Sequence, residues 1–400
     1  MKAMICGAGI AGLALAARLA HAGWDVTVTE SLPALHNEGY MVDLFGSGYE
    51  AASRMGLLPS LRDMDYEFDA VRWVSSAGRT GARISYQTVR TLFEGRLLSL
   101  LRGDLQRAVL EQLPPSVNLR FNCSVTLVRA PVGAVEVHLS TGDIERVDVL
   151  IGADGIHSRI RDLVFGDGAS WFRFLGFHTA AFVIEAPDLN TELRNELHIV
   201  SVPGRQVQLY PLRDGRVAAT FVRRAPNSAP PRSAAEALVE AYGDLGWQVP
   251  MVLERAQTLP WLVYEQVGQV VMAHWSRGRI ALLGDACQAV SLLPGQGASL
   301  SLAAAFVLGE ELCSGSDDVK AALARYEHRV RPPLIQMRRT GRRAADWLVP
   351  SSAAGVAARN ALLRLASRPG LSRLLRPAVE AARESVLPPA TRAPGADLNG

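Results

Sequence analysis

The chain has 400 residues, which is enough for two or three domains. Hydrophobic residues make up 48% and charged residues 20%, an ordinary balance for a globular protein. The net charge of +3 is too small to indicate a nucleic-acid partner or binding to an anionic membrane.

The N-terminal segment predicts a β-α-β unit. Residues 3–6 form a short apolar run typical of a buried strand, and residues 10–22 form a helix of small and apolar residues. Residues 24–29 then alternate as a second strand, which ends at Glu30. This order predicts a parallel sheet with helices on its faces.

Later segments indicate that this domain is discontinuous. Residues 147–152 and 279–284 are typical of further parallel strands. Between them, residues 207–210 and 217–222 flank a turn at Arg213–Arg216, which predicts an antiparallel hairpin in an inserted β-rich domain. Residues 317–385 are helical by pattern, and we expect breaks at Pro332-Pro333, Pro350 and Pro369-Gly370.

Two observations concern the cellular compartment. Residues 286–309 carry no charge, but Pro294-Gly295-Gln296-Gly297 interrupts them, so a buried loop running into a helix is expected rather than a membrane span. The four cysteines form no C-x-x-C pair, and no cluster of metal ligands is visible. Together with an N-terminus unlike a signal peptide, this predicts a cytoplasmic protein without a metal site.

The first motif that carries chemistry is Gly7-x-Gly9-x-x-Gly12. It follows a strand and opens a helix, and Glu30 ends the next strand at the distance typical of an acid that binds a ribose hydroxyl. Gly7 allows a tight turn, Gly9 allows a pyrophosphate to approach, and Gly12 allows the helix to pack closely on the strand. This context predicts a dinucleotide site.

Two further motifs follow predicted parallel strands. Asp154-Gly155 comes after residues 147–152, and Asp285 comes after residues 279–284. Open α/β sheets bind ligands at this carboxyl edge. Past Asp285, the loop containing Pro294 leads into a helix that begins near Gly297, whose positive end would stabilise an anion.

The order of these three motifs resembles that of the flavoprotein aromatic hydroxylases, the family of para-hydroxybenzoate hydroxylase. The segment Gly39–Gly48 is similar to the branch with the tetracycline-inactivating and polyketide-tailoring monooxygenases, and Leu101–Leu105 is similar to a segment whose arginine reaches FAD. The resemblance implies non-covalent FAD, held by a set of residues from these motifs: Gly7, Gly9, Ala11, Gly12, Glu30, Arg102, Asp154, Gly155, Asp285, Pro294, Gly297 and Ala298.

The implied fold is α/β, with a discontinuous Rossmann-type FAD-binding domain, an inserted antiparallel β-sheet substrate domain and C-terminal helices. The FAD-binding domain is expected in three parts, at residues 1–75, 101–170 and 271–330. The substrate domain is expected at 76–100 and 171–270, and the C-terminal helical region at 331–400.

Several positions have weaker interpretations. Tyr210 and Phe221 face either the substrate or the core, and Asp43 is a candidate neighbour of the flavin. Many relatives have histidine at the position of Gln288, asparagine at that of Ser299 and arginine near that of His36. No residue is identifiable as a catalytic base.

The resemblance implies an NAD(P)H-using monooxygenase. NADPH or NADH would bind transiently and reduce FAD, O₂ would add as a C4a-hydroperoxide, and one oxygen atom would enter a bulky aromatic or polyketide-like molecule. We expect a monomer or homodimer without a nucleic-acid or membrane partner. A halogenase would need a catalytic lysine beside the nucleotide domain, and Lys320 lies in a late helix. Epoxidation or a non-redox cyclisation at FAD stays open.

Overall fold

A β-α-β unit begins the chain, as the sequence predicts. β1 (Lys2–Cys6) and β2 (Asp25–Thr29) pair in parallel, and α1 (Ile10–His21) connects them. The computed structural model describes residues 1–35, 40–166, 171–290, 296–315, 318–368, 371–376 and 386–387, without the side chains of 340–344.

Strands distant in sequence extend β1 and β2 into a six-stranded sheet, whose order is β17-β18-β11-β1-β2-β7. β11 (Val149–Gly152) and β18 (Ile280–Leu282) are parallel strands, which confirms both later strand predictions. The edge strands are β7 (Asn118–Arg120), which is parallel, and β17 (Ser276–Arg277), which is antiparallel. The carboxyl ends of five parallel strands, β18, β11, β1, β2 and β7, therefore meet at one edge.

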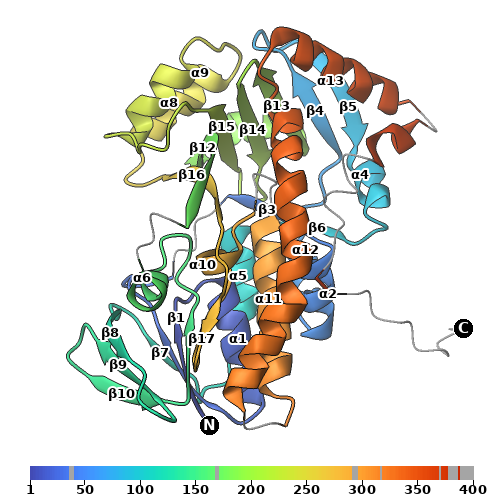
Figure 1. The fold of residues 1–400 in the computed structure, drawn as a ribbon. Helices are drawn as coiled ribbons and strands as arrows, with labels where there is room; N and C mark the ends of the chain where they lie inside the picture. The colour runs from blue at the N-terminus through green and yellow to red at the C-terminus, as the bar shows by residue number, and fades with distance from the viewer. Residues whose placement is uncertain are drawn as a thin grey trace, which may run out of the picture.

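A seven-stranded sheet forms the other half of the molecule, in the order β16-β12-β15-β14-β13-β4-β5 (Figure 1). Its strands are β4 (Ala70–Val74), β5 (Thr80–Ser85), β12 (Phe172–Glu185), β13 (Glu196–Val202), β14 (Arg205–Pro211), β15 (Arg216–Arg224) and β16 (Val263–Val270). The predicted hairpin is confirmed, because β14 and β15 pair antiparallel. Helices α8 (Ala234–Tyr242) and α9 (Val249–Gln257) cover one face.

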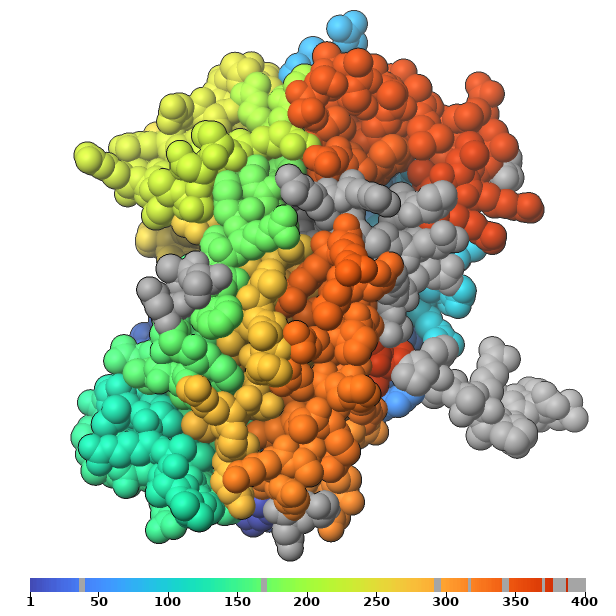
Figure 2. Space-filling view, in the orientation of Figure 1, coloured from blue at the N-terminus to red at the C-terminus, as the bar shows by residue number. Residues whose placement is uncertain are grey.

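The smaller sheets and remaining helices complete the two halves. β8, β9 and β10 form a three-stranded sheet. In Figure 2, the residues of α8 and α9 are yellow-green at the upper left, and those of β8–β10 are teal at the lower left. The remaining elements are β3 (Met41–Phe45), α2 (Ser47–Arg54), α3 (Leu58–Asp63), α4 (Tyr86–Leu92), β6 (Leu97–Leu101), α5 (Arg102–Leu110), β8 (Val125–Arg129), β9 (Val135–Leu139), β10 (Ile144–Val147), α6 (Arg159–Phe165), α7 (Pro187–Leu193), α10 (Asp285–Gln288), α11 (Gln296–Leu312), α12 (Val319–Leu348), α13 (Ala353–Ala366) and a 3₁₀ turn at Ser372–Leu375.

Two expectations from the sequence are corrected. β4 pairs with β13 and so belongs to the second sheet, although we expected residues 1–75 in the first domain. The expected break at Pro332-Pro333 is also wrong, because α12 continues through both prolines. A proline inside a helix costs about 3 kcal/mol. Burial of neighbouring apolar side chains, such as Tyr326, Val330 and Leu334, offsets that cost.

The uncharged run at 286–309 divides between α10 and α11, and residues 291–295 lie outside the described part. Among the described residues, no helix combines the length and hydropathy needed to cross a membrane.

Candidate functional site

The glycine motif forms a tight crossing of strand and helix at the carboxyl edge of the first sheet. Gly7 has a φ of +104°, and a Cβ atom there would lie 2.4 Å from the carbonyl oxygen of Ala153. A Cβ atom at Gly12 would lie 2.0 Å from the carbonyl oxygen of Gly7. At Gly9, by contrast, a Cβ atom would meet nothing within 4 Å. The loop is therefore packed on the protein side and open on the other, where a pyrophosphate could approach.

Glu30 lies beside this loop. Its carboxylate accepts hydrogen bonds from the backbone N–H of Ala8, at 2.9 Å, and from that of Leu32, at 3.0 Å. These bonds hold the acid at the end of β2, the position from which a ribose hydroxyl is bound in this type of fold.

Asp154 follows β11, and its carboxylate points into the protein. It accepts hydrogen bonds from the hydroxyl of Ser158, at 2.5 Å, and from the backbone N–H of Ile160, at 3.0 Å, near the start of α6. Burial raises the pKa of Asp154, and these hydrogen bonds oppose the rise. Its neighbours Gly155 and Ile156, rather than Asp154, face the adjacent cavity.

One cavity of about 450 Å³ joins the two halves of the molecule. Its walls include seven of the residues predicted to bind the cofactor, together with Tyr210: Gly9, Ala11, Arg102, Gly155, Asp285, Gly297 and Ala298. Four others surround the cavity: Gly7, Glu30 and Asp154 lie in loops after strands, and Gly12 lies in the first turn of α1. Pro294 falls outside the described residues.

Charged groups from three separate segments meet inside this cavity. Arg102 begins α5, Asp285 follows β18, and Glu265 lies on β16 of the second sheet. Burial raises the pKa of Glu265, Asp285 raises it further, and Arg102 opposes both effects. Burial also raises the pKa of Tyr40, to about 12. Sequence reasoning missed Glu265, which belongs to no recognisable motif, and it assigned no role to Tyr40, although Tyr40 lies in the segment Gly39–Gly48.

The two aromatic residues predicted near the substrate lie on opposite faces of the second sheet. Tyr210 lines the cavity, but Phe221 faces the other side of the sheet. Phe221 stacks on Phe182, with ring centroids 5.5 Å apart, and meets Tyr242 of α8 edge-on at 4.9 Å. The prediction for Phe221 is therefore corrected: side chains alternate along β15, and its neighbours Thr220 and Val222 face the cavity instead.

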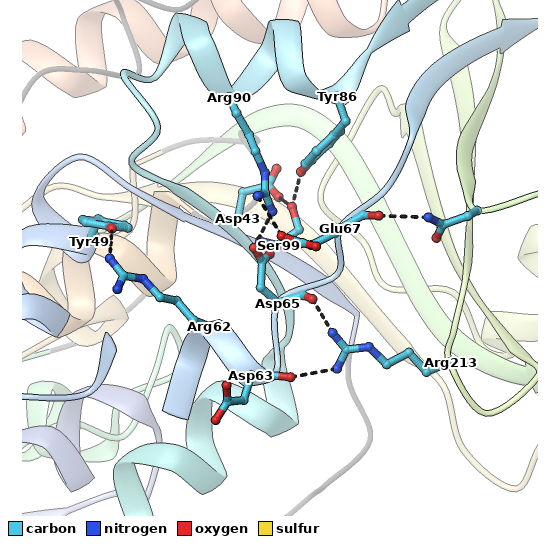
Figure 3. Close-up of polar contacts among 11 residues, drawn as sticks. Asp43, Tyr49, Arg62, Asp63, Asp65, Glu67, Tyr86, Arg90, Ser99 and Arg213 are labelled. Atoms are coloured by element: carbon cyan, nitrogen blue, oxygen red, sulfur yellow. Dashed lines mark hydrogen bonds and ion pairs between the residues drawn. The ribbon is translucent and has the colours of Figure 1, made fainter. Parts of the chain in front are cut away.

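Asp43 belongs to a buried polar cluster between the two halves (Figure 3). The hydroxyl of Ser99 donates to the Asp43 carboxylate at 2.5 Å, and it also bonds the hydroxyl of Tyr86 on α4. Asp65 accepts a hydrogen bond from the backbone N–H of Ser99, at 2.8 Å, and pairs with Arg90. Burial raises the pKa of Asp43 to about 6. Asp43 is not among the residues that line the cavity.

At two positions where this chain differs from many members of the resembling family, Gln288 and Ser299, the side chain forms hydrogen bonds within the protein. The side-chain amide of Gln288 donates to the hydroxyl of Tyr326 at 2.6 Å, and Tyr326 donates to the carbonyl of Leu282 at 3.1 Å. Ser299 accepts a hydrogen bond from the backbone N–H of Phe45 at 3.2 Å, which joins α11 to β3. His36 lies outside the described residues.

The geometry fits a dinucleotide: a glycine cradle with free space at Gly9, a helix start behind it, and a carboxylate at Asp285 that faces the cavity. A family model described as "FAD binding domain" matches residues 1–338. The chain belongs to the FAD binding domain family. Its cofactor is FAD, and it is an enzyme of the FAD-dependent monooxygenase class, as the motifs predict.

The similarity to known proteins extends over most of this FAD-binding protein. It is 30% identical over 351 residues to the 3-amino-4-hydroxybenzoate 2-monooxygenase PtnB3 of Streptomyces platensis, covering 84% of this chain and 86% of that protein. It is 28% identical over 403 residues to the FAD-dependent monooxygenase asL4 of Sarocladium schorii, covering 91% and 92%. The crystal structure of tetracycline destructase Tet(55) is similar, with a TM-score of 0.79 and 26% identity, covering 97% of this chain and 98% of that one.

Proposed function

We propose that this enzyme uses NADPH or NADH to reduce FAD and inserts one oxygen atom from O₂ into a bulky aromatic or polyketide-like small molecule. The observation that carries the proposal is the cavity that runs without interruption from the glycine loop to the face of the second sheet. Such a cavity would give the flavin and the substrate adjoining walls. A relative named for an aminohydroxybenzoate supports an aromatic substrate, and a solved structure named for tetracycline supports a bulky, multi-ring one.

The chain's own residues would divide the work along the cavity. Gly9 and Ala11 would receive the pyrophosphate, and Asp285 would accept hydrogen bonds from hydroxyl groups of the cofactor chain. Bound FAD would supply the redox chemistry, activating O₂ as the family resemblance implies. On the substrate side, apolar side chains such as Ala181 and Val222 would exclude water from the reacting atoms.

The test is flavin reduction followed by product analysis. FAD-loaded protein is mixed anaerobically with NADPH or NADH, and the loss of flavin absorbance is followed. O₂ is then admitted with a panel of aromatic polyketides, and product masses are measured. We expect reduction and a mass gain of one oxygen atom. A flavin that neither nucleotide reduces, with a product of unchanged mass, would instead establish a non-redox enzyme.

A further inference from the structure

Two rows of side chains cross the cavity face of the second sheet. In the first row, Gln206 on β14 lies opposite Val222, Val222 opposite Thr179, and Thr179 opposite Glu265 on β16. All four residues line the cavity. The row therefore runs from β14, inside the second sheet, to the charged groups near Arg102 and Asp285.

A second row lies two residues further along the strands. It consists of Gln208, Thr220, Ala181 and Val263, which also line the cavity. Residues two apart on a strand share a face, so the two rows form one continuous surface. Three steps between neighbouring strands span about 14 Å. A surface of this length, with small apolar residues between polar ones, fits a flat molecule of three or more fused rings.

The two glutamines differ in their hydrogen bonding. The side-chain oxygen of Gln208 accepts a hydrogen bond from the hydroxyl of Tyr210. Gln206 is only 3% exposed, and its side-chain oxygen has no hydrogen-bond partner among the described residues. A buried acceptor without a donor lowers stability, and a ligand hydroxyl would satisfy it. Gln206 is thus a buried position in the rows whose side-chain oxygen lacks a partner among the described residues.

The charges of the cavity disfavour an anionic ligand. Of the described residues that line it, Arg102 alone is cationic, whereas Asp285 and Glu265 are acidic. The phosphates of bound FAD would add further negative charge. A carboxylate on the substrate would therefore meet repulsion, because none of the described sheet residues that line the cavity is cationic.

We propose that this surface selects an uncharged, planar, multi-ring substrate, and that Gln206 accepts a hydrogen bond from a hydroxyl at the end furthest from the flavin. The inference rests on the proposed function, because it concerns the substrate of the same site. Gln206 is a specificity-determining residue in this scheme.

The test compares three probes of one shape: 2-hydroxyphenanthrene, phenanthrene-2-carboxylate and phenanthrene. Their dissociation constants are measured by fluorescence titration of the FAD-loaded enzyme at neutral pH. We expect the hydroxyl compound to bind about tenfold or more tightly than the carboxylate. Gln206→Leu should weaken the hydroxyl compound about tenfold and leave phenanthrene unchanged, as expected for one lost hydrogen bond.

Two further variants make the result specific. Gln87→Leu, at an exposed position on α4, is the matched control and should change no dissociation constant. Gln206→Glu keeps an acceptor of similar shape, so it should retain the hydroxyl compound and weaken the carboxylate further. FAD content shows that each variant is folded.

Three outcomes would overturn the inference: equal or tighter binding of the carboxylate, no effect of Gln206→Leu on the hydroxyl compound, or no binding of any probe. Failure of the proposed function is measured separately. It would be seen as a flavin that NADPH and NADH do not reduce, whichever probe binds.

Discussion

Asp43 is a carboxylate placed where its ionised form is unfavourable. Burial raises its pKa from 3.8 to about 6, the hydrogen bond from Ser99 opposes the rise, and the neighbouring Asp65 adds to it. Asparagine has nearly the same shape and keeps an oxygen that can accept the bond from Ser99. Asp43→Asn therefore removes the cost of ionisation while retaining the local contact.

The magnitude and its sign follow from the shift in pKa. One pKa unit corresponds to about 1.4 kcal/mol, so a shift of this size is worth at most about 3 kcal/mol. Because the folded state binds the proton more tightly, the stability that Asp43 contributes is present below its unfolded pKa near 3.8 and is lost as the pH rises through about 6. Above that pH, the ionised carboxylate destabilises the fold.

The assay is the melting temperature of the FAD-loaded protein at about pH 5 and about pH 8. We expect Asp43→Asn to raise it by about 2–5 °C at the higher pH and by clearly less at the lower one. Asp25→Asn, at an exposed position on β2, is the control and should change neither value. A variant that melts lower than the wild type at the higher pH would refute the reasoning.

Three other substitutions test the site. Gly12→Ala should lose FAD and stability together, because the added Cβ atom would lie 2.0 Å from a backbone oxygen; absorbance of the purified protein measures the bound flavin. Asp285→Ala should weaken FAD binding by about 1.5–3 kcal/mol in a fluorescence titration, and more than Asp154→Ala, whose carboxylate bonds its own loop. Equal affinities would contradict the assignment. Phe221→Leu should lower the melting temperature without changing substrate affinity, because Phe221 lies in the core. Tyr210→Phe should change substrate affinity, because Tyr210 lines the cavity. The reverse pattern would show that Phe221, rather than Tyr210, contacts the substrate.

The sequence by itself determined the dinucleotide half of this protein. Gly7 and Gly12 are required by backbone atoms only 2.4 Å and 2.0 Å from where a Cβ atom would lie, so the motif follows from local chain geometry. The β-α-β unit and the hairpin of β14 and β15 were equally predictable, because the periodicity of apolar residues and the turn residues are local signals.

Only the tertiary structure decided which residues face the substrate. Both faces of the second sheet are covered, so apolar alternation along β15 does not reveal that Phe221 faces α8 while Thr220 faces the cavity. Glu265 meets Asp285 only because β16 returns to the edge of the sheet beside β12. Such contacts join residues far apart in the chain, and strand pairing, rather than any local preference, brings them together.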